Sequence, residues 1–330
     1  MADALVITDT TYAGEAAGRF ITQHTLELDT YKNNCLMIQD GIKKQFTIPR
    51  LDVSNIVQDR MATPTSQGTI SVDGKQLVPK DYMVYVEFNP RDFETHWQAV
   101  DLQKDLIDRS LPPTANAFTV MMVLKRLIEF NEQAIWRSRI QFHPGPSQVT
   151  PASKGQASTD AQFCYFDGLI KKILDDSTTI KIAGSTLTVN NIQAQMDAAY
   201  AAVPKPLLFK YGTMGLKFHM SYATFQLWES AQMSLTFKSV DMTQTGIRRY
   251  KGYDVVALAG MPDNTIIVTI SAPDLDSHLW LGLNSTDDDS NMKMMQVQNN
   301  SELWFIKMLM KADTQIGWGL EIVISTTITA

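Results

Sequence analysis

The hydrophobic positions of the chain follow two periods, the 3.6-residue period of helices and the short runs of strands. The longest helical pattern begins after Leu111-Pro112-Pro113, which ends an earlier helical stretch, and Thr114 can cap it. One apolar face then continues to about Ile140 through Ala117, Val120, Met121, Leu124, Leu127, Ile128, Ala134 and Ile135. At 1.5 Å per residue this helix spans roughly 38 Å. We predict a long, beam-like helix over residues 114–140.

The segment before this helix, Arg60 to Phe88, is polar at first and apolar only at its end. Asp73-Gly74 is a strong hairpin signal, and Tyr82 to Phe88 has the composition of a strand. A hairpin with so little apolar content before Tyr82 cannot bury much of itself. We therefore predict that it projects from the body. Residues 1–37 show no sustained period beyond a possible short helix at Ala13–Ile21, and they indicate an extended arm.

After an irregular Pro- and Gly-rich loop over 143–161, the chain alternates between helical and strand patterns. "FDGLIKKILDD" predicts a short helix, "STTIKIAGSTLTV" predicts strands, and a helix from Ile192 to Val203 ends at Pro204. "LKFHMS" predicts a strand that delivers Ser221 as the cap of the next helix. This alternation indicates a compact α/β unit.

The stretch "YKGYDVVALAGMPDNTIIVTI", Tyr250 to Ile270, completes that unit. Its two apolar halves, 254–258 and 265–270, have strand composition, and the turn cluster Gly260 to Asn264 separates them. We predict a hairpin of two paired strands here.

Three strand patterns lie between Met292 and Ile328. Strands need partners, and the strand before the long helix, Tyr82 to Phe88, is the available one. We therefore expect the chain to leave one domain, build a second and return to the first.

Composition agrees with a folded chain: 44% of its 330 residues are hydrophobic and 19% are charged. The net charge of −6 argues against a protein whose main work is to bind phosphate backbones, and it fits a surface that lies near nucleic acid without adhering to it. The two cysteines, Cys35 and Cys164, lack the spacing of a zinc or redox site. No apolar run approaches the length of a membrane span, so we expect a protein made in a cytosol.

Catalytic signatures are missing from the sequence. It contains no nucleophile elbow, phosphate-binding loop or zinc-protease motif, and its five histidines are scattered singly. His219 sits in a predicted strand and is expected to be structural. The run Asp287-Asp288-Asp289 lacks the alternating ligands of a calcium loop, which favours a solvated loop. We expect no catalytic, cofactor or metal site.

The order of these parts resembles the major capsid protein of tailed bacteriophages, the Hong Kong 97-like fold. The segments that carry the resemblance are "FDGLIKKI", "HMSYATFQLWESA", "YKGYDVVALAGMPDNTIIVTI" and "LWLGLNSTDDD". It implies an α+β fold with an N-terminal arm, an extended loop, a peripheral domain and an axial α/β domain. The implied arm is 1–37, and the extended loop with its flanking strands is 38–91, with the loop tip at Met61–Lys80. The implied peripheral domain is 92–182, with the spine helix at 114–140. The axial domain is 183–286, and the strands of 287–330 return to the peripheral domain.

The resemblance also implies a function. The chain would assemble into pentamers and hexamers of an icosahedral shell around double-stranded phage DNA, in the host cytoplasm, with portal, separate scaffolding and decoration proteins as further partners and no membrane. The shell of an encapsulin-like nanocompartment is the second hypothesis, and an enzyme with an unusual α+β fold is the third. Six residues are candidates for contacts between subunits: Gly68, Asp73, Gly74, Lys75, Arg248 and Arg249. Lys75 and Lys80 lie in the loop that some relatives cross-link, but we predict no cross-link here.

Overall fold

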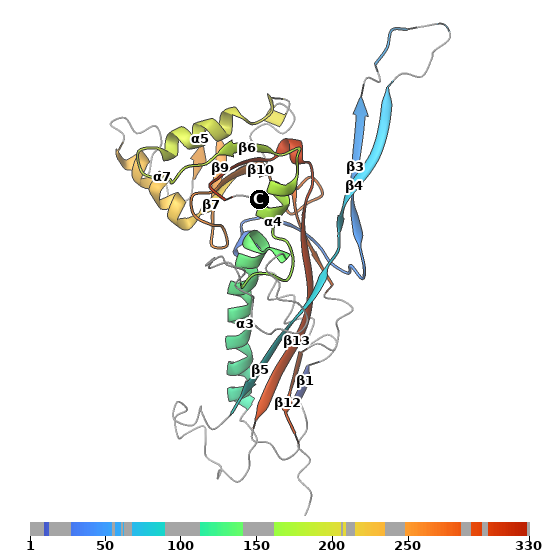
Figure 1. Ribbon diagram of the computed structural model, residues 1–330, viewed down its shortest axis with the longest axis vertical. Coiled ribbons are helices and arrows are strands. Elements are labelled where there is room, and N and C mark those ends of the chain that lie inside the picture. The colour runs from blue at the N-terminus through green and yellow to red at the C-terminus, as the bar shows by residue number, and fades with distance from the viewer. Residues whose placement is uncertain are drawn as a thin grey trace, which may run out of the picture.

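The computed structural model describes residues 10–12, 28–54, 57–60, 62, 68–89, 113–140, 162–205, 207–208, 215–234, 248–284, 292–298 and 303–328. Within these residues the framework consists of two six-stranded sheets and one two-stranded ribbon (Figure 1). Helices pack against both six-stranded sheets, so the expected α+β class is confirmed. The short helix expected at Ala13–Ile21, the helical stretch around Phe93 and Trp97, and the acidic run at 287–289 lie outside the described residues.

The first sheet is built around one long strand, β13 (Trp304–Ile316). Its strands run in the order β1 (Thr10–Tyr12), β12 (Met292–Gln296), β13, β11 (Leu279–Leu283) and β2 (Met37–Gln39). A further strand, β5 (Lys80–Phe88), pairs antiparallel with β13 from Phe88↔Trp304 to Lys80↔Ala312. The expected pairing of Tyr82–Phe88 with a C-terminal strand is therefore confirmed.

The long helix α3 (Pro113–Arg137) lies along one face of this sheet (Figure 1). A proline is tolerated at the first helical position, where its missing N–H has no partner to lose. The buried residues Leu127, Ala134, Ile135 and Trp136 of α3 share a core with Ile306, Met308 and Met310 of β13, and the short helix α4 (Leu169–Asp175) joins the same core. The helix ends three residues before the expected Ile140. No described helix is both long enough and apolar enough to cross a membrane.

The second sheet has the order β6 (Ile180–Ala183), β14 (Val323–Thr326), β10 (Ile266–Ile270), β7 (Leu216–Ser221), β9 (Tyr253–Leu258) and β8 (Arg249–Tyr250). Helices α5 (Ile192–Ala201) and α7 (Tyr222–Ser234) pack on one face of it. Side chains alternate across a strand. Ile266 and Val268 of β10 therefore join the core under these helices, while Ile267 joins the core of α3 and the first sheet. The strand β10 thus connects the two cores.

The end of β7 bears out one local prediction. Ser221 precedes α7, and its Oγ accepts a hydrogen bond from the Thr224 backbone N–H at 3.1 Å. This contact satisfies a donor that the first turn of a helix leaves free. Ser221 is the N-cap that the sequence predicted.

The hairpin predicted over Tyr250–Ile270 is wrong. The strands β9 and β10 are not paired with each other, because β7 lies between them, parallel to β9 and antiparallel to β10. The connection between them is held at the start of α7, where Ser221 Oγ donates to Asp263 Oδ1 at 2.6 Å. The hairpin of this region is β8–β9, whose turn residues Lys251 and Gly252 have φ of 51° and 89°. Two consecutive positive φ angles are what a two-residue hairpin turn requires.

The turn predicted at Asp73-Gly74 is also wrong. Both residues lie inside β4 (Thr69–Leu77), which pairs with β3 (Phe46–Ser54). A Cβ atom on Gly74 would stand 2.3 Å from the Ile48 carbonyl oxygen, so glycine is needed there for close approach of two backbones and not for a turn. The two strands are linked by residues 55–68, so the expected tip at Met61–Lys80 overlaps β4.

Two strands lie in a different sheet from the one expected. Strand β11, inside the expected axial segment 183–286, belongs to the first sheet, whereas β14, inside the expected peripheral segment 287–330, belongs to the second. Strand β6 lies in the second sheet, as expected for a strand of the α/β unit, although the implied boundary between residues 182 and 183 falls inside it. Short buried apolar runs predict strands but carry no information on which sheet will accept them. The chain therefore crosses between the two sheets more often than predicted.

Candidate assembly surfaces

The ribbon formed by β3 and β4 projects from the rest of the framework (Figure 1). Its register runs from Phe46↔Leu77 to Ser54↔Thr69, and within the described residues neither strand pairs with any other. Figure 1 shows its outer part projecting beyond both six-stranded sheets. An isolated two-stranded hairpin is marginally stable in water. The outer part of the ribbon therefore has the geometry of an arm that gains order by lying on another surface.

The inner end of the ribbon, in contrast, is anchored in an apolar cluster. Ile48 and Leu77 are buried together with Ile42 and Trp280. The ring of Phe46 stacks on that of Trp280 with centroids 6.3 Å apart. The ribbon is thus fixed to the body at one end.

A second candidate surface is the face of β5 and β13 that points away from α3. Met83 is 58% exposed, Tyr85 is 47% exposed and Leu309 is 38% exposed. Met83 lies opposite Leu309, and the rings of Tyr85 and Phe305 approach to 5.6 Å between centroids. We call the residues Met83, Tyr85, Phe305 and Leu309 the outer patch. Neighbouring exposed apolar side chains commonly mark an interaction surface.

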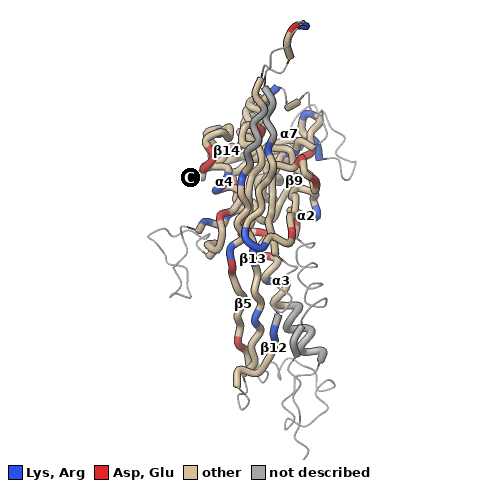
Figure 2. The backbone as a smooth tube through the Cα atoms, turned by 90° about the vertical axis from the view of Figure 1, so that its right-hand side faces the viewer, with Lys and Arg blue, Asp and Glu red and all other residues tan. Residues whose placement is uncertain are grey.

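Positive charge borders the outer patch. Lys293 of β12 lies directly opposite Lys307 of β13. Figure 2 shows lysine positions along β5, β12 and β13, together with acidic positions on β5. Like charges opposite each other on neighbouring strands repel and destabilise the sheet slightly. An acidic group on a partner would relieve this repulsion.

Buried polar residues join α3 to the second sheet and to residues 28–36. Glu132, 4% exposed, accepts hydrogen bonds from the backbone N–H and the hydroxyl of Thr30. Trp136 Nε1 donates to Thr30 Oγ1 at 2.8 Å. Burial raises the pKa of the Glu132 carboxyl, although the Thr30 hydrogen bonds oppose that shift. Arg137 Nε donates to the Gly260 carbonyl oxygen at 2.9 Å, which ties the end of α3 to the connection before β10.

The ribbon candidates occupy different environments. Gly68 is exposed with φ of 88°, just before β4. Asp73 pairs with Arg50 in the strand register, and Gly74 pairs with Pro49. Lys75 is partly buried and forms an ion pair with Asp176 of the same subunit. Contact of these residues with another subunit remains a prediction, as does the absence of a cross-link at Lys75 and Lys80.

The two arginine candidates lie at the edge of the second sheet. Arg249 Nε donates to Asp254 Oδ1 at 2.9 Å, and both side chains are exposed. The Arg248 guanidinium carbon lies 4.6 Å from the centroid of the Phe225 ring. The structure does not bring either arginine near the ribbon candidates through any described contact. Their role between subunits also remains a prediction.

His219 has the structural role that the sequence predicted. It is fully buried in β7, with Nε2 2.8 Å from Ser271 Oγ and Nδ1 3.3 Å from the Ile267 carbonyl oxygen. Burial lowers its pKa to about 3, so the ring is neutral at pH 7. Among the described residues, no group of three or more His, Cys, Asp or Glu side chains is arranged to hold a metal ion.

The residues that hold the ribbon were not found from the sequence. Asp176, Arg50 and Trp318 carry no motif, and Lys75 lies 101 positions before Asp176 in the chain. The sequence showed only that Lys75 lies in a segment poor in apolar residues. This does not indicate which distant residue would pair with it.

Comparison with known proteins gives a consistent fold over almost the whole chain. No protein-family model matches the chain, and no curated protein matches its sequence. Among solved structures, a chain of the satellite phage P4 procapsid that includes the size determination (Sid) protein matches with a TM-score of 0.56 and 12% identity, over 98% of this chain and 94% of that one. A chain of the capsid of the native GTA particle matches with a TM-score of 0.55 and 10% identity, over 100% and 96%. A chain of the capsid of Myoviridae phage XM1 matches with a TM-score of 0.51 and 11% identity, over 91% and 92%.

These matches define the class of fold. The chain has the fold of phage capsid proteins, as the sequence resemblance predicted. The match extends over nearly all of both chains.

Proposed function

We propose that this chain is the major capsid subunit of a tailed phage. Copies of it assemble into pentamers and hexamers, and these form an icosahedral shell around double-stranded DNA. The observation that carries the proposal is the agreement in fold, over nearly the full length of both chains, with chains of phage capsids.

The physical features of the subunit support this role. A shell subunit needs contact area on several sides, and the ribbon and the outer patch offer two such surfaces. In a closed shell each subunit makes several contacts at once, so individually weak contacts hold the particle together. The net charge of −6 suits a shell that encloses DNA without binding it tightly.

The shell of a nanocompartment that encloses a protein cargo is the second candidate, because its subunit would need the same contact surfaces. The difference lies in what the particle contains. An enzyme remains the weakest candidate, since the described histidines have structural partners: His219 contacts Ser271, and His278 contacts Glu321 at 2.7 Å. Portal, scaffolding and decoration proteins are proposed partners, and assembly in the host cytoplasm is the proposed setting.

The test is to purify the protein and image it by electron microscopy across a range of protein concentrations. Uniform hollow shells above a threshold concentration are the expected result. Particles recovered from infected or lysogenic cells should contain DNA that resists nuclease until the shell is opened. Shells that contain a protein cargo and no DNA would favour the nanocompartment. Both shell hypotheses would be refuted if the protein stays monomeric at all concentrations, and also when it is co-expressed with the neighbouring genes.

A further inference from the structure

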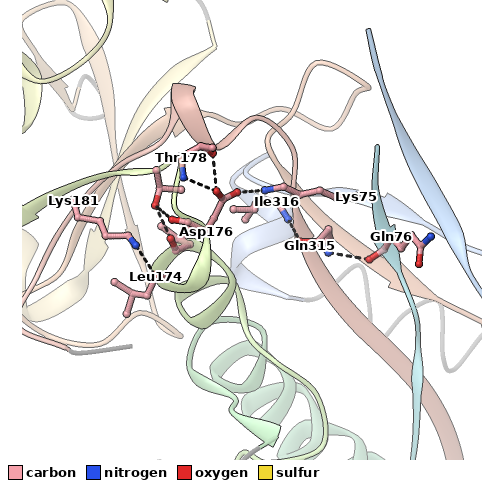
Figure 3. A network of polar contacts seen from close by, with 10 residues as sticks. Lys75, Gln76, Leu174, Asp176, Thr178, Lys181, Gln315 and Ile316 are labelled. Carbon is pink, nitrogen blue, oxygen red and sulfur yellow. Dashed lines mark hydrogen bonds and ion pairs between the residues drawn. The ribbon is translucent and has the colours of Figure 1, made fainter. Parts of the chain in front are cut away.

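The carboxylate of Asp176 lies at the centre of a polar network at the base of the ribbon (Figure 3). Asp176 follows α4 and precedes β6. Its Oδ1 accepts hydrogen bonds from Thr178, from the backbone N–H at 2.8 Å and from the hydroxyl at 2.6 Å. Its Oδ2 pairs with Lys75 Nζ of β4. The acceptor atoms of Asp176 are thus divided between its own turn and the ribbon.

Both strands of the ribbon contact the segment that ends β13. Gln315 Nε2 donates to the Gln76 carbonyl oxygen at 2.9 Å. On the other strand, the guanidinium carbon of Arg50 lies 4.0 Å from the centroid of the Trp318 ring. Asp313 Oδ2 accepts from the Val78 backbone N–H at 2.8 Å, just after β4 ends. The ribbon is therefore held from several sides at its base.

Close packing restricts the Asp176 side chain. A Cβ atom on Gly319 would stand 2.1 Å from Thr178 Oγ1 and 2.8 Å from Asp176 Oδ2. Glycine at 319 lets the connection between β13 and β14 pass directly over the network. The carboxylate therefore has little room to turn away from Lys75.

The Asp176 carboxylate is ionised over the physiological pH range, and it faces the Lys75 ammonium group in a partly buried position. The Lys75 side chain is 26% exposed and the Asp176 side chain is 13% exposed. Burial would raise the pKa of Asp176, but the hydrogen bonds from Lys75 and Thr178 outweigh it and lower that pKa to about 2. A partly buried pair is screened less by salt than a fully exposed one.

The position of Lys75 along β4 lets the Lys75–Asp176 pair restrict the orientation of the ribbon. Alternate residues of a strand point to the same side, so Lys75 shares a side with Leu77 of the apolar cluster. Lys75 therefore contacts the body about 7 Å further out than Leu77, and β4 continues for roughly 20 Å beyond it to Thr69. With the apolar cluster as a pivot, this second contact restricts rotation of the ribbon.

The network also lies where the two sheets meet. Asp176 leads into β6 of the second sheet, whereas Asp313 and Gln315 belong to β13 of the first. We propose that the Lys75–Asp176 pair is the positioning contact that sets the angle of the β3–β4 ribbon to the body. Resting on the proposed function, that angle fixes how one subunit reaches the next, and therefore the curvature of the shell.

Distances between two spin labels test the angle directly. Thr69→Cys at the start of β4 and Gln226→Cys on α7 place labels at exposed positions, while the native Cys35 and Cys164 are buried and should not react. In this background Lys75→Met removes the ion pair, Lys75→Arg restores a cation, and Asp176→Asn removes the charge of the partner while leaving an oxygen for Thr178. Lys80→Met is the matched control, since it removes an exposed lysine from β5.

We expect Lys75→Met and Asp176→Asn to widen the distance distribution about twofold, because the apolar cluster and the other contacts at the base hold the ribbon less firmly without the ion pair. Lys75→Arg and Lys80→Met should match the parent. Far-ultraviolet circular dichroism and thermal melts identify any variant that fails to fold. If Asp176→Asn does not fold, the comparison of Lys75→Met with Lys75→Arg still tests the ion pair. An unchanged width in folded Lys75→Met, or an equal widening in Lys80→Met, would overturn the proposal.

The measurement is made first on unassembled subunits at low concentration, so it does not depend on shell formation. If the parent protein forms no shells, the proposed function is refuted. The label distances still test whether the Lys75–Asp176 pair positions the ribbon. If shells form, Lys75→Met should broaden the distribution of shell diameters and Lys80→Met should not. Uniform parent-like shells from Lys75→Met would contradict the link between ribbon angle and curvature.

Discussion

Gly260 lies directly against the backbone of Glu132. A Cβ atom on Gly260 would stand 2.1 Å from the Glu132 carbonyl oxygen and 2.7 Å from Trp136 Cδ1. The connection between β9 and β10 therefore approaches α3 as closely as two backbones can. Neither neighbour is the free end of a flexible side chain, so the contact cannot relax cheaply.

The first prediction follows from this contact. Gly260→Ala should lower the free energy of unfolding by about 1–3 kcal/mol or more, because the added methyl group forces α3 and the second sheet apart. Urea unfolding followed by tryptophan fluorescence measures the loss. Ala259→Ser adds one atom at the exposed neighbouring position and should change stability by less than about 0.5 kcal/mol. Equal stability of Gly260→Ala and the parent would show that the contact between Gly260 and α3 is looser than described.

The second prediction concerns acid stability and His219. The folded-state pKa of His219 is about 3, against an ordinary value of 6.5, because the ring is buried. Between these values the unfolded chain binds a proton that the folded chain does not. Stability from this residue is therefore complete above pH 6.5 and is lost as pH falls toward 3, by about 1.4 kcal/mol per pH unit at the steepest.

His219→Gln removes this titration. Free energies of unfolding measured from pH 6.5 down to pH 4 should fall less steeply in the variant than in the parent, even if the variant is less stable at pH 7. Parallel pH profiles for the two proteins would mean that His219 is protonated in the folded state.

The third prediction tests the ribbon. Replacing residues 52–71 with Asn-Gly joins Leu51 to Val72, which already face each other in the register, and keeps Lys75 and the apolar cluster. The subunit should melt within a few degrees of the parent, because the removed part lies away from the two sheets. Closed shells should be absent in electron micrographs. Complete shells at parental yield would exclude the ribbon as a contact between subunits, and a large loss of thermal stability would place it in a core.

The fourth prediction tests the outer patch. Met83 and Leu309 lie opposite each other and are already exposed, so changing both to serine should leave subunit stability nearly unchanged. Met83 is 58% exposed and Leu309 is 38% exposed, so covering what remains exposed of both is worth about 1.5–3 kcal/mol, and the threshold concentration for assembly should rise roughly tenfold or more. Light scattering against protein concentration gives that threshold. Leu275→Ser removes a 72% exposed leucine elsewhere and is expected to leave it unchanged.

Local features of the fold were predictable because neighbours in sequence decide them. The periodic apolar face of α3, the cap at Ser221 and the strand pattern of β5 all follow from residues within a few positions of each other. The choice of partner strands was not predictable in the same way. Whether β9 meets β10 or β7 depends on contacts such as Ser221 with Asp263, which join residues 42 positions apart.

The candidate surfaces show the same division. Low apolar content predicted a projecting hairpin, and the structure contains one. We predicted its turn at Asp73-Gly74 because this dipeptide is common in tight turns. A glycine that allows two strands to approach closely, as Gly74 does, cannot be distinguished in the sequence from a glycine in a turn. The partner of Lys75 is set by how α4 packs against α3 and β13, which only the folded chain determines.

The place of β14 between β6 and β10 has a consequence for synthesis of the protein. Every other strand of the second sheet precedes residue 271, so the sheet has a gap until residues 323–326 have left the ribosome. A nascent chain cannot close this sheet early, however quickly its first strands form. Strand β6 can join this sheet only through β14, so it stays without its partner until the last residues of the chain are made. Late insertion of β14 thus delays completion of the second sheet until translation is nearly complete.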